Sequence, residues 1–188
     1  MGPVDLIAVP DIDENDTMAI RPAIYSLYVD ERNASRILAG TESALLEISH
    51  QFTRRRTETF SVVFGQLDSA GMTFDDNPQI GRVTGIARLE DEQYLLSDGT
   101  YHFLRRINLI SGGSEVAIGR PGEAGFTDGR LNTPGDLIPY QDKFLIVCQD
   151  ALHMYTTGNE NVTTFLHSPT KSGFADLRIE CGTLFKPE

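Results

Sequence analysis

Two aspartate and histidine pairs carry the residue types that could do chemistry in this sequence, Asp98 with His102 and Asp150 with His153. Each pair follows a short apolar stretch that is typical of a β-strand. Carboxylates and imidazoles that converge at strand ends can hold a divalent metal or transfer protons. Aspartate is also a common turn former, because its carboxylate accepts backbone N–H groups close in sequence. We favour the turn interpretation for both aspartates and keep a metal or acid–base site as the alternative.

Other motifs for catalysis or cofactor binding are weak. The four histidines are dispersed, and none has the H-x-x-x-H or H-E-x-x-H spacing that places two imidazoles on one metal ion. Nucleophile elbows, phosphate-binding loops and dinucleotide fingerprints do not occur in the sequence. The acidic stretch Asp11–Asp16 begins like a calcium loop, but Asp16 stands where that loop needs glycine and Pro22 where it needs glutamate. A solvated acidic loop is favoured there, and calcium stays the one candidate cofactor.

The charge balance argues against nucleic acids and membranes as partners. The net charge is −11 and the pI is about 4.7, so the average surface repels phosphate backbones and anionic lipid headgroups. No stretch reaches the roughly 18 uninterrupted apolar residues that a membrane span requires. We therefore expect neither nucleic-acid binding nor membrane insertion.

Glycosylation motifs favour an extracellular protein or an ectodomain. N-x-[ST] motifs occur at Asn15, Asn33 and Asn161, where about one is expected by chance. The start of the sequence has neither the basic nor the apolar stretch of a signal peptide, so none is expected in this chain. The two cysteines, Cys148 and Cys181, permit one disulfide, and a buried thiol at Cys148 is an equal alternative.

The chain repeats itself with a period of about 50 residues. A short motif of glycine, a hydrophobic residue and an acidic residue is centred on Gly71, Gly125 and Gly173, which are 54 and 48 positions apart. Self-similarity at this period indicates a repeat architecture.

Short strand candidates accompany each motif in the same order. Expected strands are 60–65, 115–119 and 162–166 just before the motifs, 44–49, 94–98 and 144–150 further upstream, with 23–29, 81–89 and 103–109 as additional members. Sustained helical periodicity is missing, whereas Gly, Asp and Pro turns separate the strand candidates. Four short strands per repeat predict an all-β fold built from four-stranded β-propeller blades.

The middle unit resembles a known family. Residues 117–137, with Gly122, Gly125-Phe126, Asp128-Gly129, Asn132 and Pro134, are similar to the blade junction of NHL-repeat β-propellers, within the six-bladed TolB-like superfamily. Residues 94–98 and 104–107 are similar to that family's strand core. The resemblance implies a propeller and leaves function open, because the family includes interaction modules and metal-dependent lyases.

The resemblance also suggests how the chain is divided. Residues 36–185 are expected to be one domain of three NHL-like repeats, and residues 1–35 an N-terminal segment with the acidic loop and a partial blade. About four blades at most fit this length, fewer than the six typical of the family. The ring is therefore expected to be incomplete, with self-association through its open blade edges or a missing remainder of chain.

The sequence favours a non-enzymatic binding or scaffold module, outside the cell, whose loops recognise a protein or a small molecule. The alternative is a metal-dependent propeller enzyme of hydrolase, lyase or lactonase type. Its site would lie at the channel mouth and use Asp98, His102, Asp150 and His153.

Overall fold

The computed structural model of this protein describes residues 22–30, 36–51, 57–125, 129–149, 151–157 and 161–167. Within these ranges the chain consists of strands and turns, and it has no helix that could cross a membrane. Twelve strands form three four-stranded antiparallel sheets. The predicted all-β fold of four-stranded, blade-like sheets is confirmed.

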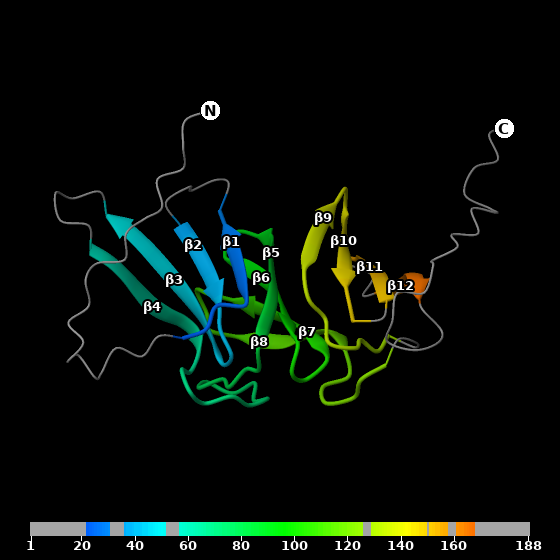
Figure 1. Ribbon diagram of the computed structural model, residues 1–188, viewed down its shortest axis with the longest axis horizontal. Coiled ribbons are helices and arrows are strands. Elements are labelled where there is room, and N and C mark those ends of the chain that lie inside the picture. Colours follow the sequence, from blue (N-terminus) through cyan, green and yellow to red (C-terminus); the bar gives the residue numbers. More distant parts are fainter. Residues whose placement is uncertain are drawn as a thin grey trace.

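Strands that follow one another in sequence are hydrogen-bonded neighbours in every sheet. The first sheet contains β1 (Ser26–Val29), β2 (Arg36–Gly40), β3 (Ala44–Gln51) and β4 (Thr57–Gly65). The second contains β5 (Val83–Glu90), β6 (Gln93–Asp98), β7 (Phe103–Asn108) and β8 (Ser114–Gly119). The third contains β9 (Leu137–Tyr140), β10 (Lys143–Val147), β11 (Ala151–Thr156) and β12 (Asn161–His167). Figure 1 shows the green second sheet between the blue and cyan first sheet and the yellow and orange third sheet.

The first repeat differs from its predicted alignment. Residues 44–49 belong to the third strand of their sheet, whereas 94–98 and 144–147 lie in second strands, so that alignment was wrong by one strand. The cause is the short strand β2, which the sequence analysis did not recognise. Residues 26–29, assigned to a partial blade, pair with β2 and form the first strand of the first sheet. The division of the chain at residue 35 stays a prediction.

A β-bulge recurs at one place in all three sheets, between the third and fourth strands. It falls between Leu45 and Leu46, between Leu104 and Arg105, and between Leu152 and His153. Because the same irregularity interrupts each ladder, it fixes which residues of the repeats are equivalent. Residues at the same position in the first, second and third sheets are Thr41, Asp98 and Cys148; Leu38, Leu95 and Leu145; and Leu46, Arg105 and His153.

The repeated glycine motif forms the junction between successive sheets. The N–H of Gly71 donates to the carbonyl of Ile80 at 3.2 Å, and the N–H of Gly125 donates to Leu131 at 3.1 Å. Both acceptor residues bury their side chains completely or nearly so. The motif therefore folds each junction loop back on itself, while Gly173 lies outside the described residues.

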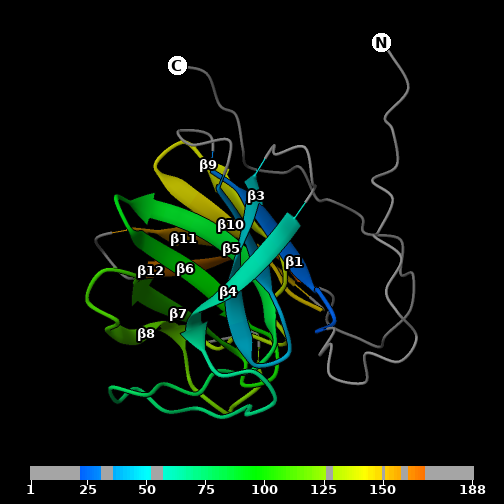
Figure 2. The same cartoon turned by 90° about the vertical axis from the view of Figure 1, so that its left-hand side faces the viewer.

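Most of the core lies in two seams, the first between the first and second sheets and the second between the second and third sheets. A smaller buried cluster of Ala39, Ala44 and Leu46 lies on the other face of the first sheet. Tyr94 and Leu96 pack against the first sheet, whereas Leu95 and Leu104 pack against the third. Alternate residues of a strand point to opposite faces, so one strand supplies both seams. Figure 2, seen from the side of the first sheet, shows β3 and β4 in front of the second sheet.

Candidate functional site

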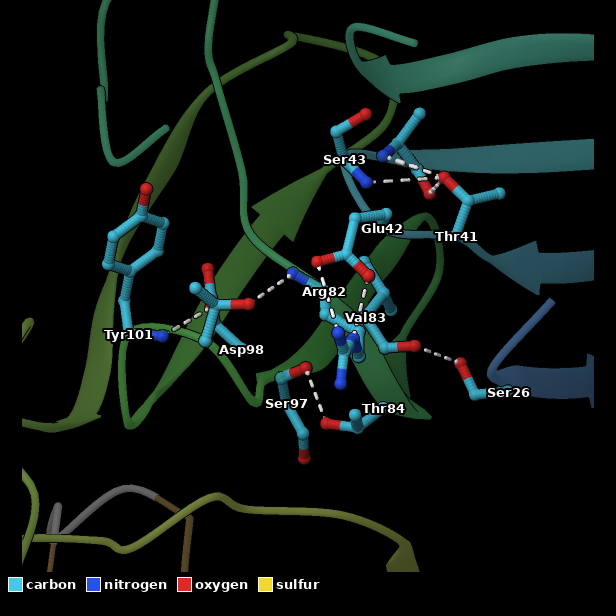
Figure 3. Close-up of polar contacts among 12 residues, drawn as sticks. Ser26, Thr41, Glu42, Ser43, Arg82, Val83, Thr84, Ser97, Asp98 and Tyr101 are labelled. Atoms are coloured by element: carbon cyan, nitrogen blue, oxygen red, sulfur yellow. Dashed lines mark hydrogen bonds and ion pairs between the residues drawn. The ribbon is translucent and has the colours of Figure 1, made fainter. Parts of the chain in front are cut away.

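Asp98 ends β6 on the inner side of a turn. Its carboxylate accepts the N–H of Tyr101 and the N–H of Gly81, both at 2.9 Å, and its side chain is buried (Figure 3). Burial raises the pKa of the Asp98 carboxyl above its ordinary value, although the two N–H groups and the Arg105 charge act in the opposite direction. The contact with Tyr101 is the one that the turn interpretation predicts, whereas Gly81 is 17 positions away and lies in the loop that leads into β5.

The two histidines lie in different settings. His102 closes the turn after β6, and its Nδ1 accepts the N–H of Thr133 at 3.0 Å. His153 lies within β11 with its side chain buried, and its Nδ1 is 3.3 Å from the hydroxyl of Thr164. The bulge alignment makes His153 equivalent to Arg105, so the two histidines do not occupy matching positions.

Asp98 and Asp150 do not match either. Cys148 takes the place of Asp98 in the third sheet, and Asp150 lies outside the described residues. In the part of the chain that the structure describes, no group of three or more His, Cys, Asp or Glu side chains could hold a metal ion.

The remaining predicted sites are largely outside the described ranges. Cys148 is buried in the seam between the second and third sheets, but Cys181 is not described, so their disulfide stays a prediction. Asn15, Asn33 and the acidic stretch 11–16 are also outside. Asn161 begins β12.

Polar contacts join the first and second sheets at the end that carries the turn after β6 (Figure 3). The Ser26 hydroxyl donates to the carbonyl of Val83 at 2.8 Å, across the first seam. Arg82 forms an ion pair with Glu42 at 2.7 Å, also between the first and second sheets. Thr41 accepts the N–H of Ala44 in the turn that is equivalent to that of Asp98. Most polar side chains at this end therefore form hydrogen bonds or ion pairs within the protein.

Arg105 binds the junction loop that leads into β5. Its guanidinium donates to the carbonyl of Thr73 at 2.7 Å and the carbonyl of Gln79 at 3.3 Å, and it lies 4.1 Å from the ring centroid of Phe74. Burial lowers the pKa of Arg105 to about 10, so the side chain is still charged at neutral pH. Its position inside a repeat strand gave no signal of this role in the sequence.

At the opposite end of the sheets, ion pairs close the first seam. Arg36 of β2 lies between Glu47 of β3, at 3.1 Å, and Glu92 of the second sheet, at 2.6 Å. Arg88 pairs with Asp30 at 2.6 Å beside it. Charges of opposite sign thus join the first sheet to the second.

The same end of the second seam is an open groove of about 460 Å³. Its walls include Leu89, Glu90, Gln93 and Arg106 from the second sheet, and Pro139, Gln141, Asp142 and Phe144 from the third. The bulge alignment shows why it is open: Gln93 takes the place of Arg36, Arg106 that of Glu47, and Asp142 that of Glu92. The central cation that bridges the first seam is therefore replaced by a neutral amide in the second.

Polar groups of the groove are only partly used by the protein. Arg106 donates to Glu115 at 2.8 Å and to the hydroxyl of Tyr155 at 3.3 Å, but its buried Nε–H has no acceptor among the described residues. Within the same described ranges, the carboxylates of Glu90 and Asp142 form no ion pair and the amide of Gln93 makes no hydrogen bond. The groove can therefore offer a solute a cationic hydrogen-bond donor, two carboxylate acceptors and a neutral amide.

This groove was not predicted from the sequence, although a signal for it exists. Residues 89–96 and 139–146 occupy matching hairpins between the first and second strands of successive sheets, and both are polar at the tip and apolar afterwards. Asp91 and Gln141 both have positive φ there, 38° and 56°. Repeated polar tips are also common in solvent-exposed hairpins, so the pattern alone does not identify a groove.

Comparisons with known proteins identify the fold and no family. No family model and no curated protein matches this sequence. Among solved structures, an auxiliary nutrient binding protein from Bacteroides thetaiotaomicron superposes with a TM-score of 0.52 at 14% identity, over 64% of this chain and 33% of that one. An auxiliary nutrient binding protein from Bacteroides ovatus gives a TM-score of 0.48 at 16% identity, again over 64% and 33%. This chain thus spans about a third of the length of these structures.

Proposed function

We propose that this protein is a non-enzymatic binding module that holds a small polar solute in the groove between its second and third sheets. The observation that carries the proposal is the contrast between the seams: Arg36 closes the first one with two ion pairs, whereas Gln93 leaves the second one open. Unpaired polar groups at a concave surface are suited to ligand binding.

The similar structure from Bacteroides thetaiotaomicron is in keeping with this proposal. It is called an auxiliary nutrient binding protein, which makes monosaccharides, amino acids and small carboxylic acids reasonable solutes to test. The enzyme alternative needs Asp98 and His102 to be available to a ligand, but both accept backbone hydrogen bonds.

An extracellular location and membership of the NHL-repeat propellers are part of the same proposal. Support for the location comes from the three glycosylation motifs, and support for the repeat type comes from the junction motif at Gly125. Secretion from a eukaryotic host followed by intact mass measurement tests the location. Added glycan mass is expected, and an unmodified chain argues against it.

The binding proposal is tested by closing the groove. The variant Gln93→Arg introduces the cation that bridges the first seam, next to Asp142. We expect at least one solute of a panel of monosaccharides, amino acids and dicarboxylates to raise the melting temperature of the unsubstituted protein, and to bind Gln93→Arg at least ten-fold more weakly by calorimetry.

The matched control is Gln149→Arg, which adds the same charge at an exposed glutamine of the opposite end of the sheets. It should bind as the unsubstituted protein does. If no solute binds, or if Gln93→Arg binds with unchanged affinity, the groove is not the binding site.

A further inference from the structure

The second sheet packs against another sheet on both of its faces, whereas each outer sheet packs against another sheet on one face only. The outward face of the first sheet follows from strand register, because residues opposite one another across antiparallel strands share a face. Among its described side chains are Leu27, Val29, Ile37, Ala39, Leu46, Ile48, Phe60 and Val62. All eight are apolar; Ala39 and Leu46 are buried in a small cluster with Leu67, whereas Leu27 is 65% exposed, Val29 53% and Phe60 50%.

The outward face of the third sheet has an apolar centre formed by Ile138, Leu145, Val147, Leu152 and Met154. Around this centre the register places Tyr140, Lys143, Thr156 and Thr163 on the same face. Ile138 is 48% exposed and Val147 39%.

These two faces correspond to the two sides of the seams already formed. Leu145 and Leu152 of the third sheet are equivalent to Leu95 and Leu104, which the second sheet buries against the sheet that follows it. Ile37 of the first sheet is equivalent to Tyr94, which the second sheet buries against the sheet that precedes it. The outward face of the third sheet thus matches the face that a sheet packs against the next sheet in sequence. The outward face of the first sheet matches the face that a sheet packs against the preceding sheet.

We propose that two copies of this chain pair head to tail, the outward face of the third sheet of each copy packing on the outward face of the first sheet of the other. Propellers typically close with four to eight blades. The described residues of one chain form three sheets, too few for a ring, whereas two copies supply six. Twofold rotation about the ring axis closes two identical seams and leaves no open face.

The first measurement is the molar mass of the unsubstituted chain in solution by light scattering after gel filtration. We expect twice the chain mass of 20.8 kDa. A monomer overturns the proposal and indicates that further sheets of a longer chain or another protein cover these faces. A series of larger assemblies overturns the closed ring.

Two single substitutions test the head-to-tail arrangement. Leu27→Glu on β1 and Ile138→Lys on β9 each place a charge in both seams of the dimer, so each should be monomeric while its circular dichroism is unchanged. Both side chains are about half exposed or more in one copy, so folding should tolerate the change. Ile110→Glu, at an 80% exposed isoleucine in the β7–β8 hairpin, is the matched control and should stay dimeric.

Mixing the two variants distinguishes the arrangement from a symmetric contact of like faces. In a mixed head-to-tail dimer one seam carries the introduced glutamate of Leu27→Glu opposite the introduced lysine of Ile138→Lys. The other seam is unsubstituted, so the 1:1 mixture should regain the dimer. If the mixture stays monomeric, or if Ile110→Glu alone abolishes the dimer, the proposed pairing is wrong.

Discussion

The second sheet and the third sheet share one strand pattern and differ in what covers them. Leu95 in the second sheet is fully buried between sheets, while its equivalent Leu145 lies on an outward face and is only half-buried. Both are leucines in the middle of a second strand. A repeat sequence therefore specifies an apolar face on each sheet, and the presence of a neighbouring sheet decides whether that face is buried and stabilises the fold.

The largest expected effect comes from deleting these two leucines in turn. Leu95→Ala should lower the free energy of unfolding by about 2 to 5 kcal/mol, because it leaves a cavity in a closed seam. Leu145→Ala should cost about 1 kcal/mol in dilute solution, where less apolar area is lost. Urea denaturation at low and high protein concentration measures both.

Repeating the urea denaturation at several protein concentrations tests whether two copies pair. If two copies pair, the cost of Leu145→Ala should grow with protein concentration, while that of Leu95→Ala should not. Equal costs for the two variants in dilute solution would show that the third sheet is already covered on both faces.

An intermediate effect is expected at the position of the bulge, where Arg105 stands in the second sheet and Leu46 in the first. Arg105→Leu introduces the side chain that the first sheet has at this position, and it removes the donors to the carbonyls of Thr73 and Gln79. Hydrogen bonds from charged groups contribute about 1.5 to 3 kcal/mol each, so we expect a loss of about 3 kcal/mol.

Arg105→Leu should also make the junction loop between the first and second sheets more accessible to proteases. Limited proteolysis of Arg105→Leu should cut within residues 66–82 earlier than in the unsubstituted protein. Unchanged cleavage and an unchanged urea midpoint would mean that packing of Phe74 alone holds the loop. Arg106→Ala, whose ion pair with Glu115 is partly exposed, is a control that should cost about 1 kcal/mol or less.

The smallest effect concerns pH and the turn that carries Asp98 in the second sheet and Thr41 in the first. Burial raises the pKa of Asp98 in the folded state, so between its ordinary value of 3.8 and the raised value the folded protein binds more protons than the unfolded one. The contribution of Asp98 to stability is therefore present below pH 3.8 and is lost as the pH rises through the folded pKa.

This sign can be measured by comparison with Asp98→Asn, which does not titrate. The free energy of unfolding of the unsubstituted protein minus that of Asp98→Asn should fall as the pH is raised from about 4 to 7. A difference that rises over this range would mean that the two backbone N–H groups outweigh burial and lower the pKa.

Much of the fold could be predicted from the sequence. Short apolar runs and regular turns predicted the strands, and the glycine spacing predicted the repeats, because both signals are local in the sequence. Strand β2 was missed since it is only five residues long and lies next to a longer apolar strand, and its omission displaced the alignment of the first unit.

The candidate site was not predictable in the same way. Asp98 and Asp150 look alike in sequence because both follow an apolar strand. The turn after β6 is longer than the turn after β10, however, and the residue equivalent to Asp98 in the third sheet is Cys148. The groove depends on Gln93, Arg106 and Asp142 meeting across a seam between two sheets. No local pattern reports which residues meet there.

The strand pattern, the repeats and the negative charge of this protein follow from the sequence, because short apolar runs, turn chemistry and composition act within a few residues. The closure of the first seam by Arg36, the open second seam at Gln93 and the burial of both faces of the second sheet depend on the tertiary structure. These features depend on side chains that are distant in sequence and on which sheet lies against which, and the packing of sheets settles both.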